Sequence, residues 1–463
     1  MMQLWKDTFH DSDGYINLIF NNYFDINLVE YEERDGKLIA AMLAIPYAFS
    51  ALYSEKTVKG LYLCGLCTLP VYRSMGLMYK LIGNINKRAY NDNYAFTFLI
   101  PANVGLQRYY EDRNYIKSCF KSENIYIEDY DFSKLIKDKN LNVEIILGSD
   151  CIINGVALSD IVTYLNTRNT VADSFDIYRT EEDAKVILEE NSMAGGTVLV
   201  ALNNAKNIIG LLVSTINSDS KVSVQKLVAD SSDIKYLLLQ KLQSYIHDKD
   251  GLKSKEIIVQ SESADDIKQI YSPYVNEFSD EFSEGVITEH DEVHNPLSAQ
   301  KVFAMSRICK LSEVLIFATA LCPAREYSIL IKEDDFAENR GLHVCKDGKY
   351  SYTPLDSFTT EELTSLEKKL AEDLNGYVLS VTGVAELLWR HGSDPLVDDV
   401  ISIPRLPLNI SLMLEKSASH PEGYMTDNKV ARLCDYRRSG RHSQGDKPSP
   451  HCKYTRAVSM LVL

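Results

Sequence analysis

Residues 66–78 combine residue types that suit the binding of an anionic group. An apolar strand ends in this segment, the chain turns at Pro70, and a helix follows an Arg73-x-x-Gly76 pattern. Gly76 lets the backbone approach a bound group closely. The free N–H groups at a helix start, together with the helix dipole, favour negative charge and suit a pyrophosphate. Arg73 adds a positive charge beside them, and Ser74 adds a hydroxyl.

The Arg-x-x-Gly pattern taken alone has little specificity, because it occurs by chance in many helices. An ordinary connection from a strand through a turn to a helix, with no ligand, explains it about as well. Whether the segment binds an anion therefore depends on the elements that position it.

Residues 1–130 alternate strands and helices in the manner of a mixed α/β sheet. Two strands within 28–49 meet at Arg34-Asp35-Gly36, where the glycine can adopt a positive φ. One apolar face characterises the helix predicted over 75–90, which we expect to lie on the sheet; it consists of Leu77, Leu81, Ile82, Ile85 and Ala89. The other predicted elements are strands at 60–69, 94–102 and 115–127 and a short helix at 106–111.

Two further blocks follow. Residues 150–285 repeat the order of the first block, which indicates an internal duplication of the fold without preserved sequence. The repeat consists of a hairpin over 196–215, a strand at 221–230, a helix at 231–248 and a strand at 255–260. Residues 295–415 predict an α+β domain. Its predicted elements are helices at 299–319, 361–374 and 380–391, strands at 326–335 and 341–355, and a terminal segment at 401–414.

The composition is that of an ordinary globular protein: 463 residues, 45% hydrophobic, 25% charged, with a net charge of -16. The length predicts about three domains. No apolar run of about 18 residues predicts a membrane span, and the first residues lack the layout of a secretory signal. The acidity argues against a nucleic-acid binder. Residues 416–463 differ, with nine basic and four acidic residues for a net +5, and we expect a poorly ordered tail.

The cysteines predict no metal site. Nine cysteines in a long chain without a signal indicate reduced thiols in a cytoplasmic protein. Cys64 and Cys67 form a CxxC within an apolar strand, where residues i and i+3 are expected to face opposite sides. No second pair follows at zinc spacing, and His290 and His294 in the acidic linker match no firm template.

Residues 66–78 resemble motif A of the Gcn5-related N-acetyltransferases, the acetyl-CoA-dependent superfamily. Arg73 and Gly76 match its Arg/Gln-x-x-Gly-x-Gly/Ala pattern, and Met78 replaces the last small residue. The stretch from Tyr110 to Tyr115 looks like the family's Tyr-x-x-x-Gly-Phe segment, with Asn114 in place of glycine. The resemblance implies Tyr110 as the catalytic residue. It implies a cofactor site made of Leu66, Cys67, Thr68, Leu69, Arg73, Ser74, Gly76, Leu77, Met78 and Asn103.

The whole layout resembles the enhanced-intracellular-survival N-acetyltransferases, in which two acetyltransferase-like mixed-sheet domains precede a sterol-carrier-like α+β domain. The implied domains are 1–135, which binds acetyl-CoA, 136–290, a degenerate copy, 291–415, the carrier-like domain, and the tail 416–463. The second copy has no Arg-x-x-Gly, so we expect no cofactor there. The resemblance also suggests a homo-oligomer.

The implied reaction moves an acetyl group from acetyl-CoA to a primary amine. A base must take a proton from the amine, backbone N–H groups around residues 67–69 can stabilise the oxyanion, and Tyr110 can protonate the thiolate, unless it only packs like Tyr109. In the resembling family the chain's own C-terminal carboxylate is the base. This chain runs on from Glu415 to Leu463, so a water chain, a cleft carboxylate or the Leu463 carboxylate remain open.

The acidity of residues 1–415 favours a cationic substrate, such as an aminoglycoside-like compound, a polyamine or a peptide lysine. A different class of function is a catalytically idle ligand- or lipid-carrier protein on the same scaffold. Met78 and the extension past Glu415 are the features that favour the carrier.

Overall fold

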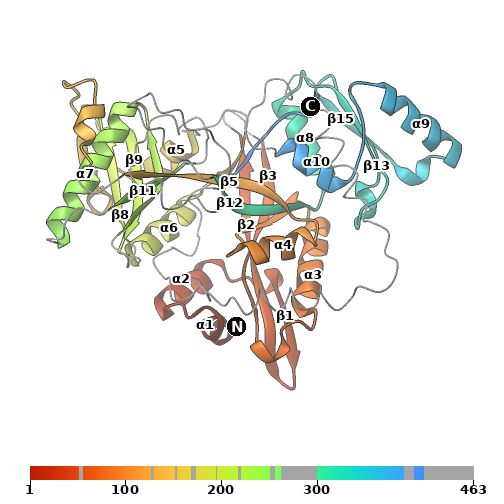
Figure 1. Ribbon diagram of the computed structural model, residues 1–463, viewed down its shortest axis with the longest axis horizontal. Helices are drawn as coiled ribbons and strands as arrows, with labels where there is room; N and C mark the ends of the chain where they lie inside the picture. The colour runs from red at the N-terminus through yellow and green to blue at the C-terminus, as the bar shows by residue number, and fades with distance from the viewer. Residues whose placement is uncertain are drawn as a thin grey trace, which may run out of the picture.

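The computed structural model describes residues 1–51, 56–126, 130–151, 154–167, 174–193, 195–216, 221–250, 256–261, 300–389 and 401–410. The chain forms three parts (Figure 1): the first at the bottom in red and orange, the second at the left in yellow and green, and the third at the upper right in teal and blue. The tail, the acidic linker with His290 and His294, Glu415 and Leu463 lie outside the described residues.

One continuous sheet joins the first two parts. Its order is β17-β7-β2-β3-β4-β12-β5-β11-β10-β9-β8-β6, with β1 paired to β2. The junction is the antiparallel pair β5–β11, in which Tyr126 lies opposite Ile257. The strands beyond the two repeats are β5 (Ile116–Tyr126), β6 (Glu144–Leu147), β7 (Phe175–Tyr178), β12 (Gln300–Ile308) and β17 (Leu408–Asn409).

The first two parts share one pattern of strands, as the predicted duplication requires. In both copies the first two strand pairs are antiparallel, and the strands on either side of the helix are parallel. The first copy comprises β1 (Val29–Arg34), β2 (Lys37–Ser50), β3 (Thr57–Thr68), α3 (Leu77–Asn91) and β4 (Phe96–Leu99). The second comprises β8 (Thr197–Leu202), β9 (Ile208–Ile216), β10 (Val222–Ala229), α7 (Ser232–Asp250) and β11 (Ile257–Ser261).

Helices cover both faces of the first sheet half. Alternate side chains of β2 pack on opposite faces of the sheet. Met42 packs with α3, whereas Leu43 packs with the N-terminal helices. The predicted turn is confirmed, since Asp35 and Gly36 both have positive φ, as a tight hairpin requires. The remaining helices of these two parts are α1 (Met2–Phe9), α2 (Asp13–Tyr23), α4 (Val104–Glu111), α5 (Leu158–Thr167) and α6 (Glu181–Met193).

The prediction of a helix over residues 299–319 is wrong in its first half. Residues 300–308 are strand β12, which pairs antiparallel with both β4 and β5. Val302, Ala304 and Met305 can fill this place because β4 and β5 leave unpaired backbone edges between them, and pairing there outweighs local helix propensity. Residues that follow the acidic linker thus complete the sheet of the first part.

The third part is α+β, as predicted, with the sheet order β15-β14-β13-β16. Asp347 and Gly348 form a positive-φ turn that divides the predicted strand 341–355 into a hairpin. Strand β16, which the sequence pattern did not indicate, pairs parallel with β13. The elements are α8 (Leu311–Leu321), β13 (Tyr327–Ile331), β14 (Gly341–Lys346), β15 (Lys349–Pro354), α9 (Thr360–Glu372), β16 (Gly376–Leu379) and α10 (Val381–Leu388).

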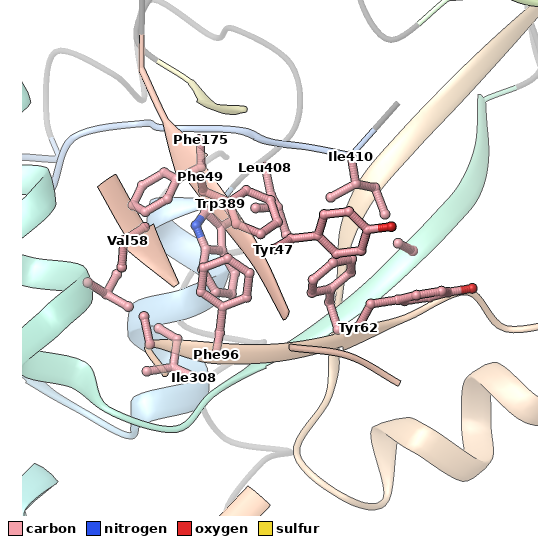
Figure 2. Packing of buried hydrophobic residues seen from close by; sticks show 14 of the residues in the cluster. Tyr47, Phe49, Val58, Tyr62, Phe96, Phe175, Ile308, Trp389, Leu408 and Ile410 are labelled. Carbon is pink, nitrogen blue, oxygen red and sulfur yellow. The ribbon is translucent and has the colours of Figure 1, made fainter. Parts of the chain in front are cut away.

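A shared aromatic core connects the three parts (Figure 2). Trp389, just after α10, is 1% exposed and contacts Phe96 of β4 at 5.3 Å and Phe175 of β7 at 6.2 Å between ring centroids. Leu408 and Ile410 of the last described segment lie in the same cluster. This core holds the C-terminal segment against the sheet of the first part. No helix in the described ranges is long and apolar enough to cross a bilayer.

Replacing Trp389 by alanine should destabilise all three parts together. Removing a fully buried indole costs about 3–5 kcal/mol, because surrounding groups lose their contacts. Circular dichroism with urea should show one transition at a lower midpoint. Leu374→Ala, at a side chain 87% exposed, is the control and should change stability by less than about 0.5 kcal/mol. Unfolding of the third part alone would contradict a shared core.

Candidate active site

Strand β3 diverges from its parallel neighbour β4 partway along its length. Gly60, Leu61 and Tyr62 pair with Phe96–Phe98, and no pairing with β4 follows. The divergence coincides with a β-bulge, since Leu43 lies opposite Cys64 while Ala41 lies opposite Cys67. Gly65 in the bulge has φ +61. A bulge bends its strand and ends regular pairing, so the backbone beyond residue 62 borders a gap between β3 and β4.

The bulge corrects the expectation for the CxxC pair. Leu43 and Ala41 are two residues apart on β2 and share a face, so their partners Cys64 and Cys67 also share a face. Both thiols lie on the side of α1, next to Trp5 and Leu4 respectively. Burial raises the pKa of Cys64 strongly and that of Cys67 to about 12, so both stay protonated. The described residues contain no group of three or more metal-ligating side chains.

The turn after β3 leads to a helix whose N-terminus is open. Ser74 and Gly76 have φ of +64 and +78, and Gly76 is the N-cap of α3. No side chain caps this helix, and no acidic residue lies in its first turn. The first intrahelical bond joins the Lys80 N–H to the Gly76 carbonyl at 3.1 Å. The amides of residues 77–79 therefore have no acceptor within the helix, as an anion site requires.

Arg73 and Leu69 hold the turn in shape. The Arg73 Nε donates to the Thr68 carbonyl at 3.2 Å. The Leu69 N–H donates to the Ile39 carbonyl at 2.9 Å, so this amide points at β2 rather than into the gap. Successive peptide groups of a strand point to opposite sides, which directs the Thr68 N–H toward the gap. Of the amides predicted for the oxyanion, that of Leu69 is therefore already used.

Tyr110 lies on the α3 side of the sheet, at the end of α4. Its side chain is 6% exposed and belongs to the same cluster as Leu81 and Leu99. Burial raises its pKa well above the usual value, with smaller contributions from Tyr109 and Tyr115. The phenol therefore keeps its proton at neutral pH.

Asn114 stabilises the end of α4. It has φ +63, as expected for an asparagine in place of glycine. The Tyr115 N–H donates to the Tyr110 carbonyl, and the Asn114 N–H donates to the Glu111 carbonyl, which is the Schellman arrangement. This turn fixes the position of Tyr110.

The predicted site residues divide between the two faces of the sheet. Leu66, Leu77 and Met78 pack against the cluster that contains Tyr110, whereas Cys67 and Leu69 pack on the α1 side. Ser74 and Gly76 are exposed in the turn. Asn103 is the N-cap of α4, and its Oδ1 accepts the Leu106 N–H at 2.9 Å.

A second group of polar residues, which the sequence did not indicate, lies on the α1 side. Burial raises the pKa of Tyr15, and the charges of Glu190, Tyr62, Cys64 and Asp11 raise it further, so these four groups act on its hydroxyl electrostatically. Asp11 is 3% exposed and Glu190 7% exposed. They come from the α1–α2 connection and from α6, so no local motif could reveal their proximity.

The sequence of the first part matches a known family model. The model of the acetyltransferase (GNAT) domain covers residues 1–116, which include β3, the turn, α3 and α4. Residues 1–116 are a GNAT acetyltransferase domain. No curated protein matches the sequence.

Solved structures share the fold over most of the chain. A GCN5-related N-acetyltransferase from Anabaena variabilis has a TM-score of 0.57 at 14% identity, covering 89% of this chain and 96% of that one. One from Kribbella flavida has 0.55 at 13%, covering 89% and 95%. A probable N-acyltransferase from Enterococcus faecalis has 0.52 at 14%, covering 76% and 82%. The fold shared with these structures therefore extends beyond residues 1–116.

Replacing Gly65 by alanine should destabilise the domain. An added Cβ would lie 2.1 Å from the Trp5 ring, and φ of +61 costs a non-glycine residue about 1–2 kcal/mol. We expect the free energy of unfolding to fall by at least about 2 kcal/mol in denaturant titrations. The matched control is Gly83→Ala in α3, where a Cβ has open space and should stabilise by about 0.5–1 kcal/mol. Equal stability of Gly65→Ala and wild type would refute the bulge.

Proposed function

We propose that the chain is an acetyl-CoA-dependent N-acetyltransferase that acts on a primary amine. The observation that carries the proposal is the gap between β3 and β4 beside the open N-terminus of α3, within a GNAT domain. A thioester group lying in the gap would meet free backbone groups of β3. The phosphates of the same acetyl-CoA molecule would meet the amides of residues 77–79.

The second copy lacks the features that make α3 suitable for phosphate. Its strands diverge in the same way, since β10 pairs with β11 over Val222–Val224 only. At the start of α7, however, Ser231 Oγ accepts the Ile234 N–H at 3.3 Å, and the Asp233 carboxylate lies in the first turn. A capped helix end with a carboxylate repels a phosphate. This contrast supports a cofactor site in the first copy alone.

Tyr110 suits the role of general acid. A phenol carries its proton at neutral pH, and the cluster around Tyr110 contains the Leu66, Leu77 and Met78 side chains assigned to the cofactor. A protonated phenol next to a departing thiolate can supply the proton that the leaving group needs. The N–H of Thr68, directed toward the gap, can donate to the oxyanion.

The polar group around Tyr15 suits the amine. Asp11 and Glu190 bring two carboxylates to the face of β3 opposite α3, so amine and cofactor would approach the gap from opposite faces. Negative charge attracts a cationic amine, and a carboxylate can then take its proton. We assign the proton acceptor to this group, whose carboxylates are Glu190 and Asp11; Asp11 also accepts the Trp5 indole N–H at 2.8 Å. The homo-oligomer and a sterol-carrier role of the third part remain predictions.

Turnover with Tyr110→Phe tests the acid. We expect release of CoA from acetyl-CoA with at least one amine from a panel of polyamines, aminoglycosides and lysine peptides. Loss of a general acid should lower kcat by roughly 10²–10⁴-fold. Tyr178→Phe, at an exposed tyrosine of β7, is the control and should act like wild type. A chain that binds no acetyl-CoA and turns over no amine is the idle carrier instead.

Glu190→Gln tests the base. We expect a lower kcat/KM, with the loss greatest below the pKa of the substrate amine, where the base is needed most. Glu189→Gln, at the neighbouring residue, is the control.

A chain truncated after Glu415 tests the alternative base. If a cleft carboxylate is the base, steady-state assays should find activity within about twofold of the full chain. A large gain in activity would instead assign the base to the new terminal carboxylate.

A further inference from the structure

Arg113 occupies an unusual position between two aromatic rings. Its guanidinium carbon lies 3.3 Å from the ring centroid of Tyr109 in α4 and 5.2 Å from that of Tyr79 in α3. Its Nη1 donates to the Tyr109 carbonyl. The turn that carries Arg113 is held from the sheet, because Arg307 of β12 donates to the Arg113 carbonyl at 3.2 Å.

The charge of Arg113 has no counterion within the described part of the chain. Among the described residues no carboxylate forms an ion pair with it, and its buried Nε has no hydrogen-bond partner. Leaving a buried guanidinium donor unpaired costs free energy. Arginine can meet that need with a phosphate, to which it donates two parallel hydrogen bonds.

Its place is beside the open end of α3. Tyr79, which Arg113 faces, is the third residue of this helix and carries one of the first-turn amides. Lys80, the next cation along α3, is already paired with Glu32 at 2.8 Å. Arg113 therefore adds a positive charge, without an ion pair among the described residues, next to a side chain from the first turn of α3.

We propose that Arg113 is a phosphate ligand of the bound acyl-CoA. This inference rests on the proposed function and adds a residue whose type neither motif specifies. The tyrosine rings hold the guanidinium in place before binding, so little side-chain entropy is lost. The phosphate is either the pyrophosphate or the 3′-phosphate of the nucleotide, and the two sources have distinct tests.

Isothermal titration of the full chain with CoA, dephospho-CoA and pantetheine tests the proposal. Arg113→Met keeps an unbranched apolar stem between the rings and removes the charge. We expect CoA binding to weaken by roughly 10- to 100-fold and pantetheine binding to stay unchanged. Equal weakening for CoA and dephospho-CoA assigns the pyrophosphate, and weakening for CoA alone assigns the 3′-phosphate. Arg108→Met, at an exposed arginine of α4, is the matched control.

The outcomes separate this inference from the proposed function. Unchanged CoA binding by Arg113→Met, or equal loss with pantetheine, would make Arg113 a structural clamp and overturn the inference alone. Absence of CoA binding by the wild type would overturn both. Circular dichroism checks the fold of the variant. If Arg113→Met does not fold, Arg113→Lys keeps the charge, and it should weaken CoA binding severalfold without affecting pantetheine.

Discussion

The loss of pairing between β3 and β4 after three residues is the constraint on which the site depends. It follows from one extra residue in β3, accommodated by the positive φ of Gly65 under the Trp5 ring. Continued pairing would occupy the backbone groups of β3 with those of β4, and no space would remain for a thioester. The same divergence brings the open end of α3 to one face of the sheet and the Tyr15 group to the other.

The two copies of the fold share their strands and differ at the helix start. Both copies keep the strand order, a register shift in the third strand and the divergence that follows it. They differ at the helix start, which is open in α3 and capped by Ser231 with Asp233 nearby in α7. The segment before the second copy contains Glu190 of α6, which we propose to act on the amine, and β7, which extends the first sheet.

Local chemistry made much of the fold predictable. The Asp35-Gly36 turn, the apolar face of α3, the repeated element order and the left-handed Asn114 all follow from neighbouring residues, and the structure confirms them. The errors concern long-range pairing. Residues 300–308 are a strand because β4 and β5 offer free edges, and Cys64 and Cys67 share a face because of a bulge set by β2. The roles of Tyr110 and the cofactor residues remain predictions, while Arg113 and Glu190 needed the tertiary structure to be found.

The proposed features converge on one event, the binding of acyl-CoA in the first copy with its phosphates on the amides of α3. Hydrogen exchange of the full chain, with and without acetyl-CoA, tests this directly at peptide resolution. We expect slower exchange in peptides that span residues 66–79 and no change in those that span 231–237. Protection of residues 231–237 with none at 66–79 would contradict it.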